Sequence, residues 1–172
     1  MNTIRIEVAT KKDAALIADL SRQTFYDAFA ADNTKEDMDK FMNEQFTREQ
    51  LMEEVGREGN VFLLAYEGEE AIGYARMRET PKPVLLEGGP AIEIARIYAM
   101  QKSIGKGVGS ALMQHCIAVA KQKSAGVIWL GVWEKNYKAI AFYTKWGFEK
   151  FSEHVFMLGN DPQTDWLMKK GL

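Results

Sequence analysis

The segment VIWLGVW, residues 127–133, constrains the fold more than any other part of the sequence. It is an unbroken apolar run of strand length, without the polar alternation of a strand that faces water on one side. A strand of this kind is buried on both faces. It lies between an amphipathic segment, 108–123, and a second helical pattern, 137–146, which ends before Gly147 at a favoured helix-stop position. We therefore expect a buried sheet strand flanked by helices.

The rest of the chain predicts further strands and helices around this segment. Thr10 and Asp13 have the spacing of a helix N-terminus. The helix that follows should bury one stripe of residues, namely Leu16, Leu20, Phe25 and Phe29. One or two amphipathic helices are expected over 34–56, and a proline-rich loop over 80–90. Strands are expected at 3–8, 61–66, 72–77, 91–100, 148–158 and 163–168. Together these elements predict a single mixed α/β domain over residues 1–172.

Charge and cysteine content exclude several classes of protein. The formal net charge is −2 and the isoelectric point is near 5.8, so no basic field is available to hold a nucleic-acid backbone. The N-terminus lacks the apolar core of a signal peptide, and no apolar run approaches the roughly 20 residues that span a bilayer. Cys116 is the only cysteine, which excludes an intramolecular disulfide. We expect a cytoplasmic protein with no nucleic-acid or membrane partner.

A glycine-rich turn follows the strand predicted at 91–100. Gly105, Gly107 and Gly109 open the next helix, and Lys106 lies among them. Residues without side chains allow backbone N–H groups to approach an anion, and the helix N-terminus adds a partial positive charge. Such a turn suits a pyrophosphate, although it is equally the sequence of an ordinary helix start. The Walker A pattern is absent, and Ser110 departs from the dinucleotide-binding GxGxxG pattern.

A second motif selects among these interpretations. The segment NYKAIAFYTKWGF, residues 136–148, has the pattern N-x-x-A-x-x-F-Y-x-x-x-G-F. Together, the glycine turn and this pattern resemble the GNAT superfamily of N-acetyltransferases over roughly residues 61–148. Ile104 departs from the glutamine or arginine that usually begins the acyl-CoA loop. The segments QTFYDAF, EIARIY, IWLGVWEKN and QTDWLM extend the resemblance to PaiA-type spermidine/spermine N-acetyltransferases along nearly the whole chain.

The resemblance implies a fold and a set of residues that bind acetyl-CoA as co-substrate. The fold is a mixed, mostly antiparallel sheet flanked by helices, with two central strands splayed to admit the cofactor. Gly131 is consistent with a close backbone approach in that gap. The implied contacts are main-chain groups of Ile97, Tyr98 and Ala99, the turn Gly105, Lys106, Gly107, Val108, Gly109 and Ser110, and the side chains of Asn136 and Lys145. Asn136 is equally a helix N-cap, and Lys145 equally a solvated lysine.

The resemblance also implies the catalytic groups of a direct transfer within a ternary complex. The phenol of Tyr143 would protonate or hydrogen-bond the leaving CoA sulfur. Glu93 would act as the base that deprotonates the attacking amine, directly or through a water, although a structural carboxylate is an open alternative. Cys116 has the spacing of a packing residue, and covalent catalysis is not predicted. His115 and His154 lack ligand-like spacing, so no metal site is predicted.

The acceptor is expected to be a small primary amine, with a polyamine such as spermidine or spermine favoured by the resemblance. Phe25, Tyr26 and Asp27 are the candidate acceptor contacts, because carboxylates and aromatic rings suit a cationic chain. The same run is also compatible with a core stripe. Two alternatives remain: a GNAT enzyme acting on a protein, peptide or antibiotic amine, and a non-catalytic acyl-CoA-binding regulator. Homodimers are common in the family, and one is compatible with the resemblance.

Overall fold

A computed structural model describes residues 3–79, 86 and 89–172, so most of the loop predicted at 80–90 lies outside the described residues. The strands form one seven-stranded sheet in the order β1-β2-β3-β4-β5-β7-β6. All neighbours are antiparallel except β4 and β5, which are parallel. The strands are β1 (Ile4–Val8), β2 (Asn60–Glu67), β3 (Glu70–Arg78), β4 (Ala91–Ala99), β5 (Val127–Trp133), β6 (Glu149–Leu158) and β7 (Asp161–Gly171).

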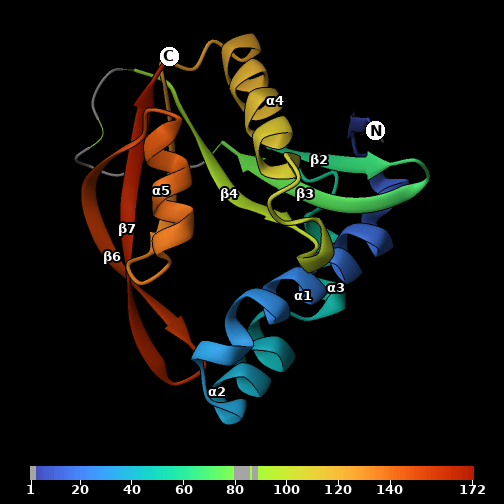
Figure 1. The fold of residues 1–172 in the computed structure, drawn as a ribbon, viewed down its shortest axis with the longest axis vertical. Coiled ribbons are helices and arrows are strands. Elements are labelled where there is room, and N and C mark those ends of the chain that lie inside the picture. Colours follow the sequence, from blue (N-terminus) through green and yellow to red (C-terminus); the bar gives the residue numbers. More distant parts are fainter. Residues whose placement is uncertain (1–2, 80–85, 87–88) are drawn as a thin grey trace.

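Helices cover both faces of the sheet, as the sequence predicts. Within the described part of the chain, the five α-helices are α1 (Ala14–Phe29), α2 (Lys35–Lys40), α3 (Arg48–Glu54), α4 (Val108–Gln122) and α5 (Tyr137–Lys145). Helices α4 and α5 pack on one face against β2–β5, and α1 and α3 pack on the other face against β2–β4. Figure 1 shows β4 running toward α1, while the hairpin of β6 and β7 extends to α2, so that the sheet opens into two arms.

The predicted elements are confirmed with small shifts at their ends. Thr10 and Asp13 form a capping box, with the Thr10 N–H donating to Asp13 Oδ2 at 2.9 Å, but they cap a short 3₁₀ turn that leads into α1. The region 34–56 contains α2 and α3, with a π-helical turn at Phe41–Gln45 between them. The predicted stripe is wrong at Leu16, which is 40% exposed. Its neighbour Ile17 is buried instead, because α1 begins at Ala14 and turns that residue toward the sheet.

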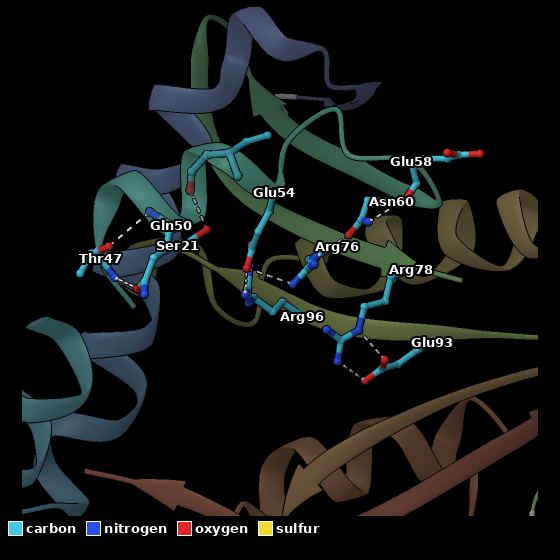
Figure 2. A network of polar contacts seen from close by, with 11 residues as sticks. Ser21, Thr47, Gln50, Glu54, Glu58, Asn60, Arg76, Arg78, Glu93 and Arg96 are labelled. Atoms are coloured by element: carbon cyan, nitrogen blue, oxygen red, sulfur yellow. Dashed lines mark hydrogen bonds and ion pairs between the residues drawn. The ribbon is translucent and has the colours of Figure 1, made fainter. Parts of the chain in front are cut away.

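A buried polar network attaches α3 to the sheet (Figure 2). Both carboxylate oxygens of Glu54 accept hydrogen bonds from Arg96, at 2.7 and 2.9 Å, and Arg76 Nη1 lies 3.2 Å from Oε1. Arg76 Nε also donates to Asn60 Oδ1 at 2.9 Å. Burial raises the pKa of Glu54, but the hydrogen bonds and charges of Arg96 and Arg76 outweigh it, and the pKa lies below its ordinary value. One carboxylate therefore neutralises part of the charge of two buried guanidinium groups.

This arrangement predicts a large stability loss for Glu54→Gln. Removing one partner of a buried ion pair leaves the other charges uncompensated, so we expect the free energy of unfolding to fall by about 2–4 kcal/mol at pH 7. The matched control is Glu53→Gln, because Glu53 is an exposed neighbour on the same helix. Because the pKa of Glu54 is depressed, the stabilisation is present at neutral pH and is lost as the carboxylate becomes protonated below about pH 4. Urea unfolding at pH 7 and in acid tests this, and equal losses for the two variants would contradict it.

Candidate active site

A cleft with a volume of about 920 Å³ lies where the two arms of the sheet separate. Residues from β4 and the end of β5 line it, together with residues from α1, the N-terminal end of α5 and β7. Strands β4 and β5 pair over Ala91–Glu93 and Val127–Trp129, and within the described residues their ladder does not continue past these positions. The cleft therefore opens between two neighbouring strands whose backbones have moved apart.

The divergence exposes one edge of β4 to the cleft. Ile97, Tyr98 and Ala99 remain paired with β3 on their other side, opposite Ala75, Tyr74 and Gly73. All three line the cleft, as does Gly131 on the opposite strand. Backbone N–H and C=O groups need hydrogen-bond partners, and on this edge of β4 the adjacent strand does not supply them. A ligand with its own amide groups can pair with the strand at this position.

The glycine turn forms the N-terminus of α4, as predicted. Gly107 is the residue before the helix, and its φ of 91° is a left-handed conformation that glycine adopts without strain. A side chain at Gly105 would meet nothing within 4 Å, so the turn is open to the outside. The first N–H groups of a 15-residue helix have no intrahelical partners and carry its partial positive charge. Ile104, which is 63% exposed, also lines the cleft next to this turn.

Helix α5 brings two of the predicted residues to the cleft and leaves one outside. Asn136 caps the helix by accepting a hydrogen bond from the Ala139 N–H at 3.3 Å, and it also lines the cleft. Tyr143 is buried and lines the cleft about two turns further on. Lys145 is exposed in the last turn, outside the described cleft lining. Asn136 therefore has the capping role, while its position leaves it accessible to a ligand.

The phenol of Tyr143 lies in an apolar environment. The rings of Phe142 and Phe148 lie 5.5 and 5.9 Å from its own, both edge-on. Burial, and then the proximity of Cys116, raise the pKa of Tyr143 well above its ordinary value. The phenol therefore stays protonated at neutral pH and is suited to donate a proton or a hydrogen bond. Burial also raises the pKa of the Cys116 thiol to about 12, which keeps it a packed thiol rather than a nucleophile.

Glu93 has a strong partner that the sequence did not indicate. Its two carboxylate oxygens accept hydrogen bonds from Arg78 Nε and Nη2, at 2.6 and 3.3 Å (Figure 2). Arg78 is among the residues that line the cleft, whereas Glu93 is outside the described lining. The pair forms across β3 and β4, where Arg78 and Glu93 are directly opposite. The ion pair with Arg78 therefore supports the alternative interpretation, in which Glu93 is a structural carboxylate.

Two of the three predicted acceptor contacts line the cleft, and the third lies outside its described lining. Phe25 and Asp27 line the cleft, but Phe25 is buried against Phe41, with ring centroids 4.6 Å apart. Tyr26 is 49% exposed and lies outside the described lining. Sequence reasoning missed Phe29 and Trp133, whose rings meet edge-on at 6.3 Å, and the acids Asp32 and Asp165, all of which line the cleft. In the sequence, Asp165 directly precedes the apolar run Trp166–Met168 of β7, and this position carries no signal of a binding role.

Two further findings concern metal ions and membranes. Among the described residues, no group of three or more His, Cys, Asp or Glu side chains is placed to hold a metal ion. Within the same residues, no helix combines the length and apolar character needed to cross a membrane.

Known proteins resemble this chain in sequence and in fold. Residues 22–148 match the Acetyltransferase (GNAT) family. An uncharacterized N-acetyltransferase of Lactobacillus delbrueckii subsp. lactis is 36% identical over 172 residues, covering 100% of this chain and 99% of that protein. An uncharacterized N-acetyltransferase of Mycobacterium tuberculosis is 27% identical over 161 residues, covering 93% and 98%.

Several solved structures have a fold similar to that of this chain. The PaiA N-acetyltransferase of Thermoplasma acidophilum, in complex with coenzyme A, aligns with a TM-score of 0.79 and 20% identity, covering 99% of each chain. The putative acetyltransferase yncA of Salmonella typhimurium, with acetyl-CoA, aligns with a TM-score of 0.72 and 19% identity, covering 99% of this chain and 95% of that one. With the family match over most of its length and a relative of 36% identity along all of it, the chain belongs to the GNAT family of acetyltransferases.

Proposed function

We propose that this protein transfers the acetyl group of acetyl-CoA to a primary amine by direct attack within a ternary complex. The observation that carries the proposal is the cleft itself, in which the free edge of β4, the N-terminal region of α5 and the buried phenol of Tyr143 come together. Similar folds hold coenzyme A or acetyl-CoA in the structures of the Thermoplasma and Salmonella proteins. These observations support an enzyme over a non-catalytic acyl-CoA-binding regulator.

The described residues fit the chemistry of coenzyme A. Its pantetheine arm carries amides, and main-chain groups of Ile97, Tyr98 and Ala99 would pair with them. Its pyrophosphate is an anion, and the turn from Gly105 to Ser110 at the N-terminus of α4 would bind it through N–H groups, with Lys106 adding charge. The Asn136 side chain would contact the arm, and Lys145 remains a proposed phosphate contact that the cleft lining does not include.

Tyr143 would serve as the proton donor to the departing sulfur. Its raised pKa keeps the proton on the phenol until a thiolate develops nearby. Glu93 remains a proposed base, but both of its oxygens accept hydrogen bonds from Arg78, so an amine would compete with a guanidinium for it. A proton acceptor that faces the cleft directly would serve the reaction better.

A polyamine is the acceptor that we favour. Asp27, Asp32 and Asp165 supply negative charge along the cleft, and Phe29 and Trp133 form an aromatic wall. A chain of methylene groups and ammonium groups matches this combination of acids and rings. The fold similarity to the PaiA N-acetyltransferase of Thermoplasma acidophilum supports the same choice.

One observation favours a second class, an amine that also carries an anionic group, such as a peptide amine. Arg76, Arg78 and Arg96 line the cleft, and among the described residues their ion-pair partners are the two carboxylates Glu54 and Glu93. Burial, and then the charge of Arg96, lower the pKa of Arg76 to about 10. Counting the described residues alone, positive charge is thus in excess on this wall, and an acceptor carboxylate would compensate it.

A panel of acceptors distinguishes the two classes. Thiol release from acetyl-CoA is measured with spermidine, spermine, a lysine-containing peptide and an aminoglycoside in separate reactions. We expect saturable release with the polyamines. Release with the peptide alone would replace the polyamine assignment by the second class. No release with any acceptor, despite tight binding of CoA, would contradict the enzymatic proposal and favour the regulator.

Tyr143→Phe tests the proposed proton donor. Because the variant retains the ring but removes the hydroxyl, we expect kcat to fall by about tenfold or more, while the Kd for CoA stays within about twofold. Tyr66→Phe on β2 is the control, because Tyr66 lies outside the described cleft lining. Unchanged kcat in Tyr143→Phe would remove this residue from the mechanism.

Gly107→Val tests the proposed pyrophosphate site. The side chain would strain a left-handed residue and crowd the first turn of α4, so we expect the Kd for CoA to rise by about tenfold or more, or roughly 1.4 kcal/mol. Gly68→Val is the matched control, because Gly68 has a φ of 60° in the remote β2–β3 turn and would meet nothing within 4 Å. Calorimetric titration with CoA measures both variants. Equal affinity in the two would show that the turn does not bind the pyrophosphate.

A further inference from the structure

His154 and Asp165 form a pair at the end of the sheet that the sequence patterns did not reveal. They are directly opposite each other on β6 and β7, so their side chains lie on the same face. His154 Nε2 is 3.5 Å from Asp165 Oδ2. Asp165 is in turn opposite Trp133 on β5. The three residues form a row across the arm of the sheet that borders the cleft.

The two members of the pair differ in exposure. The Asp165 side chain is 16% exposed and lines the cleft, whereas the His154 side chain is 50% exposed and belongs to the edge strand β6. Gly131 also lines the cleft, and a Cβ atom there would lie 3.7 Å from both Asp165 Oδ2 and His154 Nε2. The absence of a side chain at Gly131 leaves space beside both polar atoms. The pair therefore connects the cleft to solvent at the sheet edge.

The surroundings favour proton uptake by Asp165. Burial raises the pKa of its carboxyl group, and the charge and hydrogen bond of His154 oppose that rise. Tyr98 on β4 is the other titratable group on which the charge of Asp165 acts, and burial raises the pKa of its phenol so that it stays neutral. Helix α2 packs against β6 and places Asp37 at the β6–β7 turn, where it accepts from the Asn160 N–H.

The geometry points to a proton relay in which Asp165 accepts the proton of the acceptor ammonium and His154 passes it to solvent. This inference rests on the proposed function, because it needs an amine in the cleft. Only the deprotonated amine has the lone pair that attacks the acetyl carbon. The relay gives Asp165 the role of a catalytic residue and His154 that of a proton carrier. It does not use Glu93, whose carboxylate accepts hydrogen bonds from Arg78.

The relay accounts for the net proton of the reaction. The ammonium loses its first proton to Asp165, and His154 releases it to solvent. The amine nitrogen then forms the C–N bond, the C–S bond breaks, and the sulfur leaves with the electron pair. The nitrogen loses a second proton to solvent in this step. The thiolate takes a proton from Tyr143, and solvent returns one proton to the phenol, so that these two transfers balance. The products are the acetamide, the free thiol and one proton in solution.

The test compares two acceptors on the full chain. One is the primary amine that gives thiol release in the panel above, which is protonated at assay pH. The other is a fluorinated primary amine whose nitrogen is unprotonated at the same pH. For Asp165→Asn we expect kcat/KM to fall by about 100-fold with the protonated amine and by less than about threefold with the unprotonated one. Asp161→Asn, at an exposed acid of the same strand, is the matched control.

His154→Ala provides a second, independent readout. We expect kcat with the protonated amine to fall by about tenfold and to recover when imidazole is added, because the half-exposed site is open to a soluble base. Equal losses with both acceptors in Asp165→Asn, or an unrescued His154→Ala, would assign the pair a structural role and overturn the relay alone. A wild-type protein that binds CoA but acetylates no amine would overturn the proposed function and the relay together.

Discussion

The separation of β4 from β5 is the constraint on which the rest of the site depends. Two parallel strands that pair over three residues and then diverge leave backbone groups that a folded protein must satisfy in another way. Because β4 stays paired with β3, and β5 with β7, the sheet tolerates the opening without losing its two arms. The opening then determines which residues of α1, α5 and β7 can meet, since each is attached to one side of it.

The two walls of the cleft have different chemistry. On the side of α4 and α5, the groups that face a ligand are mainly backbone amides and one neutral phenol. On the side of α1, α3 and β7, they are charged side chains whose positions depend on ion pairs, such as Glu54 with Arg96 and Arg76. Burial strengthens these ion pairs and also makes an uncompensated charge costly. The arginines of this wall are therefore held in buried ion pairs, and under the proposed function an acceptor would have to match their charge.

Much of the fold and part of the candidate site could be predicted from the sequence, because periodicity and motifs indicate local structure. The apolar run at 127–133 is the buried strand it was predicted to be, with Gly131 as its one exposed position. The glycine turn opens α4 and Tyr143 lies on α5, which confirms the helices predicted at 108–123 and 137–146. The pairs Arg78–Glu93 and His154–Asp165 were not foreseen, because cross-strand partners depend on register. Bulges near Arg76 and Lys150 shift that register in ways that no local pattern encodes.

The origin of the two walls has a consequence for how such a protein can diversify. Backbone amides persist through most substitutions, whereas a wall of side chains changes with each replacement on α1, in the π-helical turn Phe41–Gln45 or on β7. Selection can therefore alter the amine that is recognised in small steps while the acyl donor stays the same. Descendants of one ancestral gene would then share a donor and differ in their acceptors, with the variable positions concentrated on one side of a single opening.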